Sequence, residues 1–179
     1  MIKVAIMFGG PGKEHEVSLS SAKNILENID RNLFDVLEVL VTQDKKYEID
    51  GKFFNEDDGI EEIKEKGVEI VFPVIHGTYG EDGELQEKLE QDGIRFVGSS
   101  GKVSAVTIDK NKTNKILEEN GIRIPRSTII TKEDCGFNFT YPIIIKPIDE
   151  GSSVDLYKFE NEIDFKNHAE VIFKNHKQM

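Results

Sequence analysis

The stretch "IKVAIMFGGPGKEHEVSLSSAKNILENI", residues 2–29, decides the fold predicted for this chain. It begins with a short apolar run rich in β-branched side chains that ends at a glycine pair, which indicates a buried strand followed by a loop. Further on, apolar residues recur at helical spacing and form one face of a helix: Ala22, Ile25, Leu26 and Ile29. The stretch therefore predicts a strand, a glycine-rich turn and an amphipathic helix.

The same order of elements repeats downstream. Strands are expected at 34–42, 68–75 and 94–98, helices at 59–67 and 83–93, and a hairpin at 45–54 around Asp50-Gly51. Strands and helices that alternate at this spacing predict parallel βαβ units. The first part of the chain is therefore expected to be an α/β, Rossmann-like domain with a doubly wound parallel sheet, whose ligands lie beyond the carboxyl ends of the strands.

The pattern changes near residue 100. From Gly101 onward the sequence predicts two helical pieces that stop at Gly121, then three strands and a final helix, at 126–131, 141–147, 152–160 and 161–176. We therefore expect one domain at 1–100 and a second, α+β domain at 101–179.

Composition excludes several classes of protein. The 34 acidic residues outnumber the 23 basic ones and give a net charge of −11. This charge would repel a phosphate backbone, so a nucleic-acid partner is not expected. One cysteine, Cys135, rules out an intramolecular disulfide and a multi-cysteine zinc site. No apolar run reaches the roughly 18 residues of a membrane span, so a cytoplasmic protein without a membrane partner is expected.

A first polar constellation follows the first strand. Glycines at 9, 10 and 12 precede Glu14, His15 and Glu16. The segment is not a dinucleotide fingerprint, because His15 stands where a third glycine is needed, and it is not a zinc-binding HExxH motif, because Leu19 replaces the second histidine. Two interpretations stay open: the glutamates complement a helix dipole beside a surface histidine, or the loop lines a ligand site.

A second constellation, "HGTYGEDG" at 76–83, follows the third strand in the same way. Since both loops leave carboxyl ends of parallel strands, we expect them at the same edge of the sheet. Asp82 is placed to cap the next helix. His76 is either a satisfied loop histidine or a side chain that the turn presents to a ligand.

A third constellation, "YPIIIKPIDEGSSV" at 141–154, ends an apolar strand with a lysine. Lys146 is expected to reach a cleft with its head group, because a buried ammonium is costly. The Gly-Ser-Ser loop offers backbone and hydroxyl donors, and a lysine beside such a loop is a common way to hold polyphosphate. Lys110 could add a second charge, although a lysine-rich helix start is more often a solvated face.

Together these stretches resemble the D-alanine–D-alanine ligase family of the ATP-grasp superfamily. The resemblance rests on "EHEVSLSSA" at 14–22, "HGTYGEDGELQ" at 76–86, "SAVTIDK" at 104–110 and "IIIKPIDEGSSV" at 143–154. It implies that 1–100 is the family's N-terminal, pre-ATP-grasp domain and that 101–179 is the first lobe of an ATP-grasp domain, truncated before its second lobe. It further implies a homodimer through the N-terminal domain.

The resemblance implies ATP-driven ligation of two D-alanines, through an acyl phosphate, in peptidoglycan precursor synthesis. Glu14 would hold the ammonium of the first D-alanine and share a hydrogen-bonded network with Ser152, and His76 would lie beside the substrate. The ATP phosphates would be contacted or covered by the remaining site residues: Lys110, Lys146, Glu150, Gly151, Ser152 and Ser153. Mg²⁺ or Mn²⁺ is expected of the family, but its ligands belong to the second lobe, so no metal ligand is expected in this chain.

Two residues depart from the family pattern. Asp155 stands where glycine is usual, and Glu87 stands where a small residue is usual. Because the second lobe would carry the metal ligands, we expect the 179 residues not to ligate alone.

Two further hypotheses stay open at this point. One is a non-catalytic remnant or binding module for D-alanine or a nucleotide. The other is a metal hydrolase that uses His15, Glu16, His76 and Asp82, although no pair among them has helical metal spacing.

Overall fold

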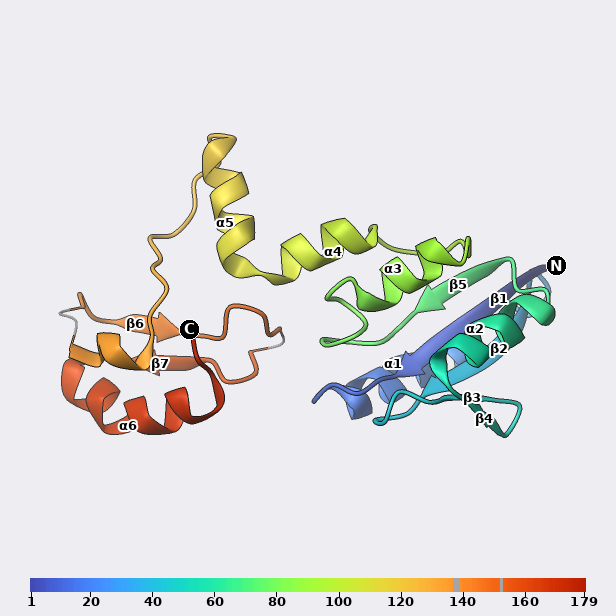
Figure 1. Ribbon diagram of the computed structural model, residues 1–179, viewed down its shortest axis with the longest axis horizontal. Coiled ribbons are helices and arrows are strands. Elements are labelled where there is room, and N and C mark those ends of the chain that lie inside the picture. Colours follow the sequence, from blue (N-terminus) through green and yellow to red (C-terminus); the bar gives the residue numbers. More distant parts are fainter. Residues whose placement is uncertain (137–138, 152) are drawn as a thin grey trace. The chain divides into compact units, whose positions relative to one another are not determined.

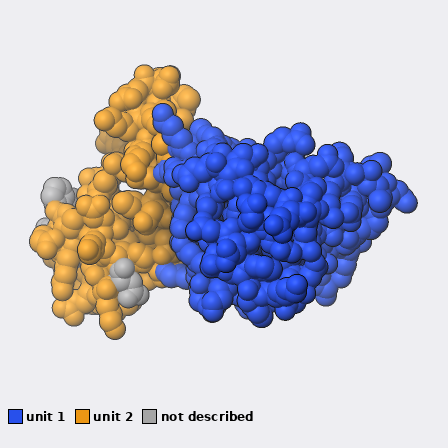
Figure 2. Space-filling model, turned by 45° about the vertical axis from the view of Figure 1, so that its right-hand side comes forward, with its two compact units in different colours: residues 1–105 blue, residues 106–179 orange. Residues whose placement is uncertain are grey.

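The structure, a computed structural model, describes residues 1–136, 139–151 and 153–179 (Figure 1). It divides into two compact units, Met1–Ala105 and Val106–Met179, which Figure 2 shows in different colours. The division falls within helix α4 (Gly101–Ile108), a few residues after the expected boundary at residue 100. Each unit has a hydrophobic core of its own and is described by itself.

The first unit is built on a mainly parallel sheet (Figure 1). Its strands are β1 (Ile2–Gly9), β2 (Phe34–Val41), β3 (Tyr47–Ile49), β4 (Lys52–Phe54) and β5 (Ile70–Pro73), in the order β4-β3-β2-β1-β5. Strand β1 runs parallel to both β2 and β5, and β3 and β4 form an antiparallel hairpin. The expected α/β class with a parallel sheet is confirmed.

Helices cover both faces of this sheet: α1 (His15–Asn28), α2 (Glu56–Glu65) and α3 (Glu84–Gln91). Val4 and Ile6 of β1 pack with Ala22 of α1, whereas Ala5 and Met7 face the opposite core with the apolar residues of α2 and α3. Strand β1 is therefore buried on both sides, which explains why its sequence is nearly all apolar instead of alternating. Each such large side chain contributes about 1.5–3 kcal/mol on burial.

Two local predictions in this unit have different outcomes. The turn at Asp50-Gly51 has a positive φ at both residues, 50° and 75°, as a type I′ hairpin requires. The strand expected at 94–98 is wrong, because it shrinks to one parallel bridge between Val71 and Phe96. Gly98 has a φ of 141°, so the backbone leaves the extended conformation directly after the bridge.

The second unit combines α5 (Lys110–Glu119), a 3-10 turn (Lys132–Gly136), β6 (Ile143–Ile145), β7 (Tyr157–Phe159) and α6 (Glu162–Asn175). Strands β6 and β7 are antiparallel, and α6 packs on them through a small apolar core: Ile130, Ile145, Phe159, Phe165, Ala169, Ile172 and Met179. Helix α5 ends before Gly121, whose φ is 72°, as expected of a helix stop.

The strand expected at 126–131 is also wrong. Residues 126–129 are exposed, and Ile130 exchanges two backbone hydrogen bonds of 3.0 Å with Met179. A single exchanged pair of residues is too short to continue as a ladder, so the β-branched composition of the segment does not produce a strand. None of the helices in the described part of the chain is long and apolar enough to cross a membrane.

Candidate functional site

Helix α1 begins earlier than its apolar face suggested. Glu14 is the N-cap, and His15 and Glu16 lie in the first turn instead of preceding the helix. The buried Ser18 accepts a hydrogen bond from the N–H of Gly9 (2.8 Å) and donates one to the carbonyl of Val74 (2.7 Å). One serine hydroxyl thus joins the segments that follow β1 and β5. Sequence reasoning missed Ser18, although its place one turn before Ala22 on the inner face was a signal.

The 76–83 loop is stabilised by its own side chains. Glu81 Oε2 accepts from the N–H of Gly77 (3.0 Å), and Asp82 Oδ2 accepts from the N–H of Tyr79 (2.8 Å). Asp82 Oδ1 also accepts from the first helical N–H of α3, at Glu84 (3.0 Å). Asp82 therefore caps α3 as expected, from the position before the N-cap residue Gly83. The two acidic residues build the turn.

The two glycine-rich loops lie against each other at the carboxyl edge of the sheet, as expected. A Cβ added at Gly77 would lie 2.6 Å from Glu14 Oε2, and one at Gly12 would lie 3.5 Å from the backbone N of Thr78. Gly77 also has a φ of 66°. Glycine is needed here both for the backbone conformation and for the close approach of the glutamate.

The carboxylate of Glu14 is the unusual polar group of this edge. Glu14 is only 8% exposed. Among the residues that the structure describes, its buried Oε1 has no hydrogen-bond partner. A buried carboxylate oxygen without a donor is costly, whereas a cationic donor would satisfy both its charge and its lone pairs. The geometry therefore suits a ligand with an ammonium group.

His76 directly precedes Gly77 in the sequence and is held from two sides. Its Nε2 lies 3.1 Å from Ser21 Oγ of α1, and its Nδ1 lies 4.0 Å from Glu81 Oε1. The ring remains one-third exposed, with 33% of the side-chain surface accessible. Helix and loop together fix its orientation while leaving part of it open to solvent or a ligand.

His15, by contrast, turns back into its own loop, with Nδ1 2.7 Å from the carbonyl of Gly10. The described residues contain one group of three potential metal ligands, and it includes none of the four residues of the metal-hydrolase hypothesis. That hypothesis has no geometric support in the part of the chain described.

A buried tyrosine pair anchors the loop from the opposite side. The hydroxyl of Tyr79 hydrogen-bonds with that of Tyr47 on β3 and donates to Glu56 Oε1 at 2.7 Å. Burial is the main cause that raises the pKa of both tyrosines, and the nearby Glu56 charge adds to it. Sequence reasoning missed this network, because its members are 23 and 32 residues apart and no local pattern joins them.

In the second unit, Lys110 is the first residue of α5. Its Nζ donates to the carbonyl oxygens of Ile148 (3.4 Å) and Glu150. Burial, followed by the charge of Lys146, lowers the pKa of Lys110. Lys146 follows β6 and is exposed, and the expectation that its head group reaches a cleft stays a prediction.

The segment after Lys146 forms a tight turn. The N–H of Val154 donates to the carbonyl of Gly151 (3.0 Å), and Ser153 has a φ of 60°. Ser152, expected to share a network with Glu14, lies outside the described residues. The structure thus brings Lys110 to the backbone of Glu150, within the second unit, while Glu14 and His76 belong to the first.

Comparisons with known proteins agree on one family. Residues 3–99 match the family model described as the D-ala D-ala ligase N-terminus. Relatives include a D-alanine–D-alanine ligase from Oceanobacillus iheyensis, 34% identical over 91% of this chain and 55% of the relative. D-alanine–D-alanine ligase A from Escherichia coli is 30% identical over 97% of this chain and 58% of the relative.

Solved structures give the same answer for the fold. The D-Ala:D-Ser ligase VanG from Enterococcus faecalis matches with a TM-score of 0.76 and 29% identity, over 99% of this chain and 61% of that one. A D-alanine–D-alanine ligase from Bacillus anthracis matches with a TM-score of 0.77 and 26% identity, over 99% and 56%.

The chain spans about half the length of the curated relatives it matches. The family is one of ATP-dependent ligases. Because the family model covers residues 3–99, more than half of the 179 residues, this chain belongs to the D-alanine–D-alanine ligase family.

Proposed function

We propose that this chain is the part of a D-alanine–D-alanine ligase that binds the first D-alanine and the phosphates of ATP. The reaction would convert ATP and two D-alanines to D-alanyl-D-alanine, ADP and phosphate, for peptidoglycan precursors. The observation that carries the proposal is the buried Oε1 of Glu14, which has no hydrogen-bond partner among the described residues and lies at the ligand-binding edge of the sheet.

In this proposal Glu14 accepts hydrogen bonds from the ammonium group of D-alanine. The charge-assisted bond would offset the desolvation of a carboxylate that is now 8% exposed. His76, held by Ser21, would present its exposed ring edge to the substrate carboxylate or to the acyl phosphate formed from it. The backbone N–H groups of Gly77 and Tyr79 are already bonded to Glu81 and Asp82, so these two N–H groups are not assigned to the ligand.

The phosphate-binding role is proposed for the second unit. The charge of Lys146 helps to lower the pKa of Lys110, so two ammonium groups repel each other there. A polyphosphate between them would relieve that repulsion, and the residues present therefore fit ATP. Bound ATP would supply the phosphoryl group, while Lys110, Lys146 and the backbone at Gly151 and Ser153 would hold its phosphates. The expectation that Glu150 and Ser152 help to cover the ATP phosphates stays a prediction.

Magnesium fits the residues of this chain less well. Mg²⁺ prefers oxygen ligands in octahedral geometry. The group of three potential ligands found in the described residues includes His176, a nitrogen donor. We therefore assign no step of the proposed reaction to a metal held by this chain. A cytoplasmic location, expected from the sequence, and a homodimer through the first unit, implied by the resemblance, stay predictions.

The test of the proposed reaction is phosphate release from ATP by this chain extended with the remaining part of a family member. We expect release that depends on D-alanine and is reduced at least tenfold by Glu14→Gln. Glu16→Gln, an exposed neighbour on α1, serves as the matched control. If the extended chain folds and phosphate release does not depend on D-alanine, the proposed reaction is wrong.

A second candidate is a binding module without turnover, favoured by the same observation at Glu14, because an unpartnered buried oxygen bears on binding and not on turnover. Calorimetry on the 179-residue chain distinguishes it. Affinity for D-alanine or ATP, together with an inactive extended chain, would support the module. No heat with either ligand would contradict it.

A further inference from the structure

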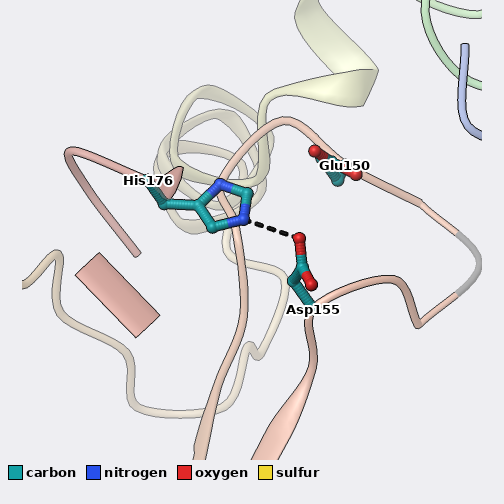
Figure 3. Close-up of side chains that lie close together, drawn as sticks. All are labelled: Glu150, Asp155 and His176. Atoms are coloured by element: carbon teal, nitrogen blue, oxygen red, sulfur yellow. Dashed lines mark hydrogen bonds and ion pairs between the residues drawn. The ribbon is translucent and has the colours of Figure 1, made fainter. Parts of the chain in front are cut away.

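Three potential metal ligands come together in the second unit, on segments that are distant in sequence. Glu150 precedes the tight turn, Asp155 follows it, and His176 lies directly after α6. Their ligand atoms all lie within 4.8 Å of one another, and all three residues are half-buried (Figure 3). His176 Nε2 faces Asp155 Oδ2 at 2.8 Å, with the carboxylate of Glu150 beside them.

The donor set has a defined chemistry. One imidazole nitrogen with two carboxylates suits first-row transition metals, whereas Mg²⁺ and Ca²⁺ select oxygen donors. Metal–ligand bonds of about 2.0–2.2 Å at tetrahedral angles place donor atoms about 3.3 Å apart. The pair of His176 and Asp155 would therefore open slightly to admit a cation, and Glu150, on a flexible side chain, would move inward.

The backbone conformation of Asp155 is unfavourable for an aspartate, and the contact of its side chain offsets that cost. Asp155 has a φ of 51°, in the left-handed region that favours glycine. An aspartate in this conformation costs up to about 1 kcal/mol relative to glycine. Its carboxylate gains a hydrogen bond with an imidazole of which only 11% of the side-chain surface is exposed. Asp155 thus places an acidic group against a largely covered histidine side chain.

Nearby cations set a limit on affinity. Lys110 Nζ bonds the carbonyl oxygen of Glu150, and the charge of Glu150 raises the pKa of Lys110 against the larger effects of burial and Lys146. A divalent cation bound by Glu150 would be repelled by that ammonium. In an alternative interpretation, the three residues form a purely structural hydrogen-bonded cluster. This interpretation predicts no metal affinity.

We propose that Glu150, Asp155 and His176 form a binding site for a divalent first-row transition metal, represented by Zn²⁺ and Ni²⁺, which joins the turn at 150–155 to the end of α6. The site is separate from the magnesium expected of the family and does not depend on the proposed ligase function. The spacing of the three residues along the sequence carries no metal motif, so only the fold reveals it.

The test is a titration of the 179-residue chain with Zn²⁺, in which calorimetry measures the affinity. Titrations with Ni²⁺ and Mg²⁺ are carried out in parallel. We expect one strong Zn²⁺ site, comparable Ni²⁺ binding and at least a tenfold lower affinity for Mg²⁺. His176→Gln and Asp155→Gly should each weaken Zn²⁺ binding at least tenfold. His168→Gln is the matched control, because His168 also lies on α6 but is not one of the three grouped ligands. Its Nδ1 lies 2.8 Å from the backbone carbonyl of Asp164, and its ring centroid lies 5.8 Å from that of Phe159.

The Asp155→Gly variant is expected to fold, because glycine fits the positive φ at this position. A loss of Zn²⁺ binding in this variant would therefore not result from misfolding. The Co²⁺ form gives a second readout, because its visible absorption should change on substitution of His176 and should not change on substitution of His168. Equal Zn²⁺ affinity in the unsubstituted chain and the Asp155→Gly and His176→Gln variants would overturn the proposal. Equal affinity for Zn²⁺ and Mg²⁺ would overturn it as well.

Discussion

The 76–83 loop and the 150–155 turn are both rich in small and acidic residues, but they are held in different ways. In the first unit, Glu81 and Asp82 bond the backbone of their own loop, and Tyr79 joins it to a buried network. In the second unit, the described contacts of the turn include backbone hydrogen bonds from Val154 to Gly151 and from Leu156 to Ser153 (3.3 Å), and side-chain contacts from Lys110 and His176.

The difference separates two kinds of site. The first loop is fixed before any ligand arrives, so its exposed groups are preorganised for binding. The described contacts of the second turn include two long-range ones, from Lys110 and His176, and both of these groups carry or can carry positive charge. Its conformation should therefore respond to anions and metals, whereas that of the first loop should not.

The largest loss of stability is expected from a substitution at Gly80, in the loop that is held by its own side chains. A Cβ there would overlap the carbonyl oxygen and carbon of Ile75, which are backbone atoms that cannot move aside cheaply. We expect Gly80→Ala to lower the free energy of unfolding by about 3 kcal/mol or more. Urea denaturation followed by circular dichroism measures it. Gly93→Ala, with a φ of 69° and open space around it, is the control and should cost about 1 kcal/mol.

A smaller loss is expected from Ser18→Ala. The substitution leaves the N–H of Gly9 and the carbonyl of Val74 buried without their present hydroxyl partner. The expected cost is about 2 kcal/mol. Ser20→Ala, exposed on the same helix, should change the free energy of unfolding by less than about 0.5 kcal/mol. Equal effects of the two substitutions would contradict the role given to Ser18.

The tyrosine network predicts a pH dependence of the first unit. Burial raises the pKa of Tyr47 and Tyr79, so both stay protonated in the folded state while an unfolded tyrosine ionises near pH 10. The unfolded state then binds fewer protons, and stability is complete below about pH 10 and falls above it. The slope should reach about 1.4 kcal/mol per pH unit for each tyrosine.

Tyr79→Phe should flatten that slope and lower the free energy of unfolding at neutral pH by about 1–2 kcal/mol. Tyr157→Phe, in the second unit and outside this network, is the matched control. Denaturation curves recorded from pH 8 to pH 11 check both. A slope that is the same in the unsubstituted chain and in Tyr79→Phe would show that the buried hydroxyl is not its source.

The smallest effect is expected at Asp155. Asp155→Gly loses the bond to His176 but relieves the positive φ, and the two contributions are of similar size. We expect a change of less than about 1 kcal/mol in the free energy of unfolding, measured by urea denaturation without metal. A loss as large as that of Gly80→Ala would show that the two loops are held with similar strength.

Much of the fold could be predicted from local patterns. The apolar run of β1, the helical face of α1 and the Asp50-Gly51 turn each follow from neighbouring residues. The contact of the two glycine-rich loops followed from the rule that parallel strands end at one edge. The strands expected at 94–98 and 126–131 failed, because a strand also needs an extended neighbour to pair with, and β-branched composition does not supply one.

The sites were predictable to a smaller extent. Glu14 and His76 stood out through their motifs, but burial of the Glu14 carboxylate depends on its approach to Gly77, 63 positions along the chain. The network of Tyr47, Tyr79 and Glu56 and the pair of Asp155 and His176 depend on long-range packing. Asp155 was recognisable as a departure from a family pattern, and nothing local connected it to a histidine 21 residues away.

The central claim is that the buried oxygen of Glu14 is built to receive an ammonium group. The direct measurement is the dissociation constant of D-alanine for the chain, from amide chemical shifts in an NMR titration. The account predicts shifts at Gly77 and Thr78 that saturate in the unsubstituted chain and in Glu16→Gln, with at least tenfold weaker binding in Glu14→Gln. Equal D-alanine affinity in all three proteins, or no binding in any of them, would contradict it.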